Sequence, residues 1–303
     1  MHAKVPERTM MGVNPGFSPV SMDMAQEYVR LYSLCPSKSS YYSFGSLWAW
    51  RDVFRFTWAF ERGLCWIGTE DGGLWAPVGP WDRIPWREVL PGLFPGRATF
   101  SFVPEELARQ LKEAFPGQIA AREDRSQWEY LHSVRDLIEL RGNRFSRKRW
   151  HIRQFEKNHA FTYRSLSRGD GGAVLECQRL WLAEHSPSFA LSRENEAISR
   201  MIRDWSVIPG LLGGIIEVNG NPVAYTVAEA LTEDMLMIHF EKGLSSYNGA
   251  YQVINRMFLE RTASSFSVVN REEDLGEEGM RVAKMSYHPV GFLKKCALSW
   301  CSE

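Results

Sequence analysis

The stretch VNREEDLGEEGMRVAKMSYHP, residues 269–289, joins the end of an apolar strand to a dense group of polar side chains. A short β-branched run ends at Val269, and an Asn, an Arg and three acidic residues occupy the next five positions. Gly276 then permits a sharp turn, and a short helical pattern carries Lys284 and Tyr287 before Pro289 ends it. The pattern predicts convergent polar groups at a strand end, where α/β proteins place binding and catalytic side chains.

Two interpretations of this stretch stay open. The candidate substrate-binding residues are Asn270, Arg271, Glu272 and Lys284. Asp274 and Tyr287 are candidate catalytic residues, because the acids could hold a cationic amine and the phenol could protonate a leaving oxygen or sulfur. In the alternative, the run is a solvated acidic loop that caps a helix. We adopt that interpretation for Glu273, Glu277 and Glu278.

The second half of the chain has the periodicity of one α/β unit. The expected elements are a strand at 161–166, helices at 172–185 and 193–206, strands at 211–218, 222–230 and 234–241, a helix at 249–263, and strands at 266–270 and 293–300. Ser192 is the expected cap of the second helix, and Asn219-Gly220 is a strong hairpin signal. A helix pair, a hairpin and then strand–helix–strand predict a sheet flanked by helices.

The first half predicts a second unit of the same class that ends near residue 140. The expected helices are 22–34, 42–51 and 104–114, and the expected strands are near 54–60, 64–69, 73–77, 98–102, 118–123 and 129–134. Proline-punctuated loops are expected from Pro77 to Pro95. The fold class is therefore α/β, with an N-terminal domain over 1–140 and a C-terminal domain over 141–303.

Three further segments carry a resemblance to a known family. They are YYSFGSLWAW (41–50), RGNRFSRKRWHIRQFEKNH (141–159) and HFEKGLSSYNGAYQVIN (239–255). With residues 269–289, they resemble, in order, the bacterial family of the catalytic C-terminal part of phosphatidylglycerol lysyltransferases, which also includes soluble proteins of unknown function. The resemblance implies two tandem GNAT-like domains (acyl-CoA N-acyltransferase-like) and acyl or aminoacyl transfer.

The segment 141–159 is strongly basic, with seven Lys or Arg side chains against one Glu, a local net charge of +6. Phe145, Ile152 and Phe155 define one face of a helix, and Lys148 falls near its middle, where a charge is costly unless it is paired or reaches solvent. The candidate donor-binding residues here are Arg144, Arg147, Lys148, Arg149 and His151. They favour contact with tRNA backbone or a nucleotide-bearing donor; the alternative is a solvated helix that joins two domains.

The turn after residues 234–241 is a second candidate phosphate site. In GNAT proteins the pyrophosphate of the donor binds backbone N–H groups where a strand turns into a helix. Ser245, Ser246 and Gly249 occupy that turn, but the usual GNAT signature is not intact, and a turn that simply needs glycine is equally consistent. Glu241, on the preceding strand, is the candidate general base, whereas His239 on the same face is more typical of a core residue.

Composition limits the remaining possibilities. The formal net charge is zero, so nucleic-acid contact would require a local patch, and 44% hydrophobic content is typical of a globular protein. The five cysteines have no CxxC spacing, which suggests neither a metal site nor a disulfide framework. With no apolar run long enough to span a membrane and no signal-like N-terminus, the sequence predicts a reduced, cytoplasmic protein.

Two classes of function are therefore expected. The first is a transferase that moves an activated acyl group onto an amine or hydroxyl acceptor, with aminoacyl-tRNA or acyl-CoA as co-substrate and no tightly bound cofactor or metal. The basic helix and the incomplete GNAT signature favour the tRNA-type donor. The acceptor is a small molecule, a peptide or a lipid headgroup, and the missing membrane half of the lipid enzymes argues against a phospholipid. The second is a non-catalytic ligand- or nucleic-acid-binding module with the same fold.

Overall fold

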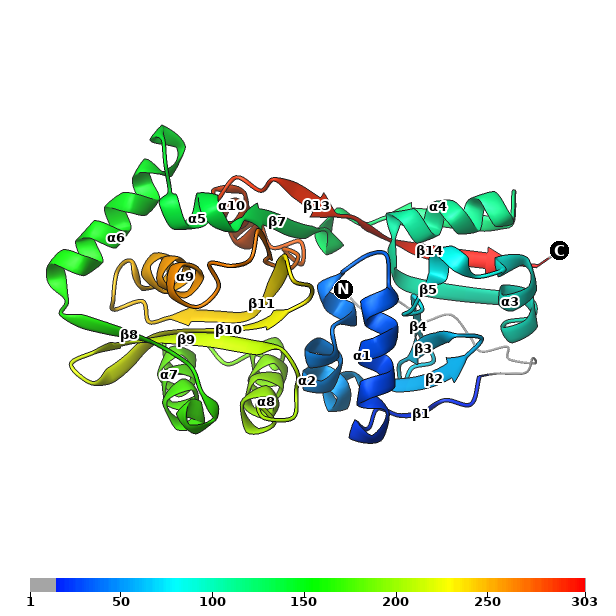
Figure 1. Ribbon diagram of the computed structural model, residues 1–303, viewed down its shortest axis with the longest axis horizontal. Coiled ribbons are helices and arrows are strands. Elements are labelled where there is room, and N and C mark those ends of the chain that lie inside the picture. The colour runs from blue at the N-terminus through cyan, green and yellow to red at the C-terminus, as the bar shows by residue number, and fades with distance from the viewer. Residues whose placement is uncertain (1–14, 303) are drawn as a thin grey trace.

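The computed structural model describes residues 15–302, which form two α/β units side by side along the long axis of the molecule (Figure 1). Each unit is built on a seven-stranded mixed sheet flanked by helices. The expected fold class, two tandem units each with a mixed sheet, is confirmed.

The first sheet lies in the unit at the right of Figure 1. Its strands, in spatial order, are β1 (Ser18–Pro19), β2 (Thr57–Glu61), β3 (Leu64–Gly68), β4 (Leu74–Trp75), β5 (Arg97–Pro104), β14 (Lys295–Cys301) and β6 (Ile119–Glu123). The helices of this unit are α1 (Ala25–Leu34), α2 (Phe44–Phe54), α3 (Trp86–Leu93) and α4 (Glu105–Ala114), with short 3-10 turns at 22–24, 40–42, 81–83 and 125–127. The core of this unit is rich in large aromatic side chains, and Trp58, Trp66 and Trp300 are all fully buried in it.

The second sheet repeats this strand order. Its strands are β8 (Phe161–Ser165), β9 (Leu211–Val218), β10 (Asn221–Ala230), β11 (Met235–Gly243), β12 (Val268–Asn270), β7 (Glu129–Ser133) and β13 (Gly291–Leu293). Its helices are α5 (Val134–Glu139), α6 (Ser146–Asn158), α7 (Gly171–Ala183), α8 (Phe189–Arg203), α9 (Ala250–Arg261) and α10 (Glu278–Met285), with 3-10 turns at 143–145 and 168–170. Figure 1 shows α7 and α8 below the sheet and α9 above it.

The two units exchange one strand each. β7 lies between β12 and β13 of the second sheet, although it precedes the expected boundary at residue 140. β14 lies between β5 and β6 of the first sheet, although it ends the chain (Figure 1). The segment expected to be one strand at 293–300 therefore belongs to two strands, β13 and β14, which lie in different sheets. A domain boundary at residue 140 does not separate the two sheets, because each contains a strand from the other side of that boundary. Side-chain alternation predicts a strand but not its partner, because pairing uses backbone groups that every residue has.

Two helix assignments also differ from the expectation. The proline-rich segment from Pro77 to Pro95 contains α3, which tolerates Pro91 within it. α8 begins at Phe189, four residues earlier than expected, because the Ser188 side chain, and not that of Ser192, accepts the capping hydrogen bond, from the N–H of Leu191.

Candidate active site

A gap opens between the parallel strands β11 and β12 of the second sheet. β12 pairs with β11 only over Met235–Met237, whereas β11 continues to Gly243. Next to the gap, the register between β10 and β11 shifts by one residue at His239, which marks a β-bulge. Diverging carboxyl ends of parallel strands form the crevice where open α/β sheets bind ligands.

Glu241 and Arg271 meet in this gap. A guanidinium nitrogen (Nη2) of Arg271 donates to Glu241 Oε1 at 2.8 Å, and the side chains are 14% and 7% exposed respectively. Asn255 of α9 and Thr226 of β10 donate to the other carboxylate oxygen, at 3.0 and 3.2 Å. Arg271 Nη1 is buried without a hydrogen-bond partner among the described residues. Both carboxylate oxygens of Glu241 are therefore hydrogen-bonded, whereas the Nη1 group of Arg271 has no partner within residues 15–302.

Tyr287 and Lys148 complete the group. The Lys148 ammonium lies 3.9 Å from the centre of the Tyr287 ring, and the Arg271 guanidinium lies 4.9 Å from it. Burial raises the pKa of Tyr287 to about 12, against the opposing effect of the Arg271 charge. Burial, reinforced by Arg271, lowers the pKa of Lys148 to about 8. The phenol is therefore protonated at neutral pH, and the amine is partly neutral.

The exchanged strand β7 supplies two residues that sequence reasoning missed. The rings of Tyr130 and His132 stack at 6.4 Å, and His132 meets the Tyr287 ring edge-on at 6.5 Å. Burial lowers the pKa of His132 to about 3, so the imidazole is neutral, with Nε2 3.1 Å from the carbonyl of Lys284. No sequence signal linked these residues to the gap, because β7 was expected in the other unit.

Asp274 belongs to an ion-pair cluster that the Tyr130 hydroxyl joins to β7. Its oxygens accept from Arg281 at 2.9 and 3.0 Å and from the Tyr130 hydroxyl at 2.5 Å, and Arg125 lies 3.3 Å away. The hydrogen bonds from Arg281 are the main cause that lowers the pKa of Asp274 well below its usual range. These contacts hold the loop that leads into α10 in place. Asp274 therefore has a structural role and is not available as an acid or a base.

The remaining residues of the acidic stretch are also held by protein groups. Asn270 donates to the buried carboxylate of Glu129, and Lys284 Nζ donates to the backbone carbonyls of Arg271 (2.6 Å) and Glu273. Glu273, expected to be solvated, is only 9% exposed and accepts from Tyr41 of the first unit at 2.9 Å. That expectation was wrong because the first unit covers this loop.

The turn before α9 offers less room for a phosphate than expected. The N–H of Ser245 donates to the Glu184 carboxylate at 2.8 Å. Gly249 has φ +98°, and a Cβ added to it would lie 2.4 Å from the carbonyl oxygen of His151. His151 Nδ1 is also 3.0 Å from Asn248. Helix α6 thus covers the N-terminus of α9, while Ser245 and Ser246 are exposed beside it.

The cations of α6 and of the 3-10 turn just before it fall into two groups. Arg144 pairs with Asp136 at 2.8 Å, and Arg149 donates to the carbonyls of Leu140 and Gly142, so both have structural partners. On the side opposite the buried face, an exposed stripe consists of Arg147, Trp150, Arg153 and Lys157. Within residues 15–302 its three cations have no ion-pair partner, and Trp150 is 50% exposed.

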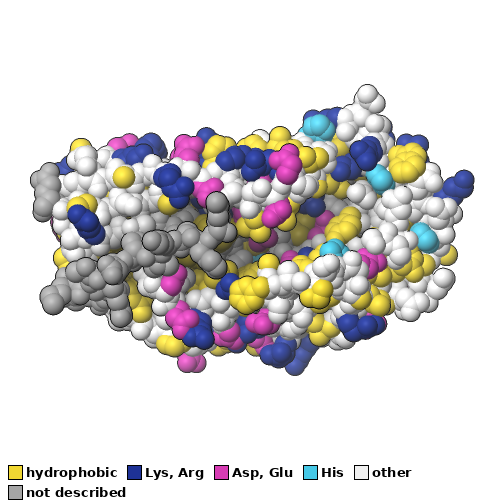
Figure 2. Space-filling view, turned by 180° about the vertical axis from the view of Figure 1, so that it is seen from behind, with side chains coloured by type: hydrophobic (Ala, Val, Ile, Leu, Met, Phe, Trp, Pro, Cys, Tyr) yellow, Lys and Arg dark blue, Asp and Glu magenta, His cyan; other side chains and the backbone are white. Residues whose placement is uncertain are grey.

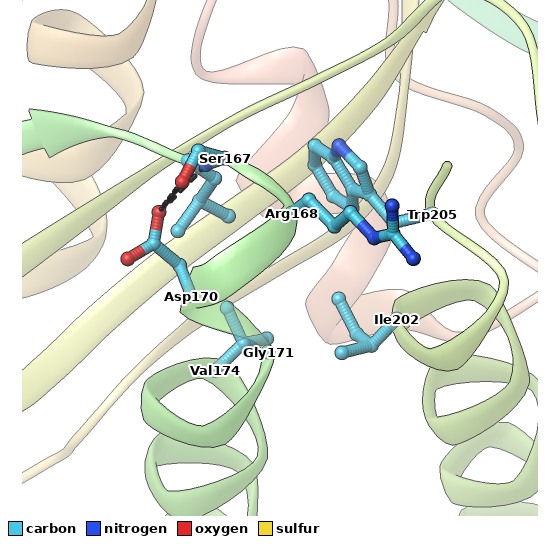
Figure 3. A pocket seen from close by; sticks show the side chains of 8 residues that line it. Ser167, Arg168, Asp170, Gly171, Val174, Ile202 and Trp205 are labelled. Carbon is cyan, nitrogen blue, oxygen red and sulfur yellow. Dashed lines mark hydrogen bonds between the residues drawn. The ribbon is translucent and has the colours of Figure 1, made fainter.

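Two cavities are lined by residues other than those of the gap. Figure 2 shows a hollow along the middle of one face, with acidic and basic side chains on its walls. The depression in Figure 3, beneath Arg168 and Trp205, has a volume of about 10 Å³, which holds roughly one water molecule. A larger pocket of about 450 Å³ lies between α4, β6 and β14 and is lined by none of the candidate site residues.

Two negative findings apply to residues 15–302. No group of three or more His, Cys, Asp or Glu side chains there is arranged to hold a metal ion. No helix in that range has the length and hydrophobicity needed to cross a bilayer.

Solved structures with the same fold cover nearly the whole chain. A conserved protein of unknown function from Bacteroides thetaiotaomicron VPI-5482 is 25% identical, with a TM-score of 0.86, over 95% of this chain and 100% of that one. The C-terminal domain of a putative lysylphosphatidylglycerol synthetase from Agrobacterium fabrum is 13% identical, with a TM-score of 0.60, over 91% and 92%. L-PGS from Bacillus licheniformis is 13% identical, with a TM-score of 0.61, over 97% and 94%.

At the sequence level, no curated protein matches the chain. A family model described as "Phosphatidylglycerol lysyltransferase, C-terminal" matches residues 32–297, which include the whole second sheet, most of the first sheet, the gap and the basic helix α6. The chain therefore belongs to the family of phosphatidylglycerol lysyltransferase C-terminal domains.

Proposed function

We propose that this protein is an aminoacyltransferase that uses the gap between β11 and β12 and takes its acyl group from an aminoacyl-tRNA-type donor. The observation that carries the proposal is the buried Arg271, which Glu241 holds in place and whose Nη1 has no hydrogen-bond partner within residues 15–302. Membership of a family named for a lysyltransferase supports the reaction class.

The chemistry of acyl transfer assigns a task to each group in the gap. Attack on the ester carbonyl develops negative charge on its oxygen, which Arg271 Nη1 would stabilise. Lys148, with its lowered pKa, would accept the proton from the attacking amine or hydroxyl, and Tyr287 would donate one to the leaving oxygen. Lys148 would then return its proton to Tyr287, which restores both groups for the next turnover. Glu241 is then a positioning residue for Arg271 and not the base expected from the sequence.

The exposed side of α6, the helix whose buried side carries Lys148 into the gap, favours a polyanionic donor over acyl-CoA. The exposed stripe on α6 combines three cations with Trp150, the pairing of charge and aromatic surface that binds nucleic-acid backbones and unpaired bases. The turn that holds a pyrophosphate in GNAT proteins is instead covered by α6 and bonded to Glu184.

Turnover of radiolabelled total aminoacyl-tRNA with a panel of amine, peptide and lipid-headgroup acceptors tests the reaction. We expect label transfer, and a loss of about 10²–10³ in kcat for Arg271→Gln, the cost of removing one oxyanion donor. Arg203→Gln, an exposed position on α8, has the same charge change and should keep full activity. Saturable donor binding with no transfer to any acceptor would favour the binding module instead.

The donor class is tested by salt dependence. The double variant Arg147→Gln/Arg153→Gln should reduce the slope of log K against log salt by roughly 1.4–1.8, because each phosphate contact contributes about 0.7–0.9. Arg203→Gln should leave that slope unchanged. An unaltered slope in the double variant would mean that α6 is only a structural connection between the units.

A further inference from the structure

One segment of the first unit, residues 39–45, donates hydrogen bonds to three carboxylates of the second unit. The pairs are Ser39 and Ser40 with Glu129, Tyr41 with Glu273, and Gly45 with Glu229. Tyr42 fixes the segment in the first unit, because its hydroxyl donates to the Phe102 carbonyl at 3.0 Å and accepts from the Ala76 N–H at 3.1 Å. Figure 1 shows α2, which begins at Phe44, at the junction of the two units. The segment is thus anchored in one unit and bonded to the other.

The contacts with Glu129 reach the point where β12 leaves β11. Met237 and Asn270 are the last pair between these two strands. The Asn270 side chain donates to Glu129, the same carboxylate that accepts from the Ser39 hydroxyl and, at 3.0 Å, from the Ser40 N–H. Hydrogen bonds to a carboxylate are roughly twice as strong as those between neutral groups. The end of β12 is therefore attached to the 39–45 segment through one buried carboxylate.

The other side of the gap, β11, is attached to the same segment through a buried pair of side chains. His239 lies two residues beyond Met237, at the β-bulge, and its Nε2 donates to Glu229 Oε2 at 2.8 Å. The other oxygen of Glu229 accepts from the Gly45 N–H at 3.3 Å. A Cβ added to Gly45 would lie 2.3 Å from Glu229 Oε2 and 3.1 Å from His239 Nε2. Any larger residue at this position would therefore displace the pair.

We infer that the 39–45 segment is a brace that fixes the separation of β11 and β12, and with it the relative position of Glu241 and Arg271. Glu241 lies two residues beyond His239, and Arg271 directly follows Asn270, so each moves with its own anchor. The first unit thus has a task in a gap that belongs to the second sheet. The consequence for acyl transfer rests on the proposed function, whereas the brace itself rests on the contacts alone.

A second contact between the units supplies a matched control. The Arg200 side chain of α8 donates to the Ala49 carbonyl of α2 at 2.7 Å, and the Asp204 carboxylate accepts from the Trp48 indole N–H at 2.8 Å. If the 39–45 segment only held the units together, losing a bond at either contact would have the same effect. Arg200→Met removes a hydrogen bond between the same two helices and keeps the brace.

Hydrogen–deuterium exchange followed by mass spectrometry tests the brace without turnover. Gly45→Ala should speed the exchange of residues 238–243 about 10-fold, because a hydrogen bond to a charged group is lost. Ser39→Ala and Tyr41→Phe should each do the same for residues 268–276, which contain the end of β12 and Glu273. Exchange in the first sheet should not change in these variants, and Arg200→Met should leave both segments at the wild-type rate.

Three results overturn the brace: wild-type exchange of both segments in all three variants, an equal increase in Arg200→Met, or a uniform increase across both units. Tyr41→Phe removes a single hydroxyl and keeps the test available if Gly45→Ala does not fold. In the transfer assay, the brace variants should lower kcat about 10- to 100-fold, the cost of a small misplacement, with unchanged affinity for the donor. Faster exchange with unchanged kcat would overturn the positioning role. If the wild type transfers nothing, the transferase proposal fails, and the exchange rates alone decide the brace.

Discussion

Lys148 has a pKa of about 8, which is closer to neutral pH than the pKa values of Tyr287 and His132 beside it. It lies on the buried side of α6, above the Tyr287 ring, and Arg271 is close enough to disfavour its protonated form. Only an element that packs against the gap can impose this environment. Helix α6 thus has the exposed stripe on one side and places the Lys148 amine in the gap on the other.

The lowered pKa of Lys148 gives a testable dependence of stability on pH. Between the folded pKa of about 8 and the ordinary lysine pKa of 10.5, the unfolded chain binds more protons than the folded one. The cost of burying the ammonium is thus fully present below pH 8 and is relieved as pH rises toward 10.5. Lys148→Met should be more stable than the wild type at pH 7 in urea denaturation, and this advantage should shrink by pH 10.

Lys157→Met is the matched control for that measurement. Lys157 lies on the exposed stripe of the same helix, so its removal should produce no difference that varies with pH. A stability difference for Lys148→Met that stays constant from pH 7 to 10 would show that the ammonium is not desolvated.

At the scale of elements, the contact between α6 and α9 decides the shape of the site. Gly249 permits it, because its left-handed φ and missing side chain let the backbone of His151 approach. The same contact brings Lys148 to the gap and covers the turn that could otherwise receive a pyrophosphate.

Gly249→Ala should therefore separate the two helices. A Cβ there would lie 2.4 Å from a backbone oxygen, a clash that side-chain rotation cannot relieve. We expect a loss of about 2–4 kcal/mol in the free energy of unfolding, measured in urea, with weaker tRNA binding. Gly220→Ala is the control, since Gly220 has φ +79° but open space around it, and should lose only about 1 kcal/mol from backbone strain. Equal losses in the two variants would contradict the proposed role of the contact.

For the whole molecule, strand exchange makes each unit depend on the other. β14 fills the position between β5 and β6, and β7 fills the corresponding position in the second sheet. The buried pair of Lys295 and Glu129 sits where the two exchanged strands begin, at 2.7 Å. Because neither sheet is complete without a strand from the other half of the chain, the full chain should unfold in one transition.

The exchange predicts which fragments fold. A fragment of residues 1–140 lacks β14 and exposes the facing edges of β5 and β6, so we expect no dispersed amide spectrum by NMR. Joining residues 1–124 to 294–303 through a short glycine turn should restore folding, since Cys296 already pairs with Glu123 at the end of β6. A well-folded 1–140 fragment would show that the exchange is dispensable.

The sequence by itself determined the local features. Apolar periodicity predicted the helices and strands of the second half, and it placed Lys148 on the buried face of the basic helix. The polar residues after Val269 were correctly expected at a strand end, and Arg271 among them does lie in the gap. These properties depend on neighbours within a few residues, which the sequence displays directly.

Only the tertiary structure decided the partners. β7 reaches the gap from a segment about 140 residues away from Arg271 in the chain, so Tyr130 and His132 had no signal that linked them to it. Glu273 resembled a solvated acid until the first unit covered it, and Glu241 resembled a free base until Arg271 bonded to it. Strand pairing depends on which backbone edges meet in the folded chain. The pKa of a side chain depends on its burial and on the charges beside it. Residues distant in sequence set both.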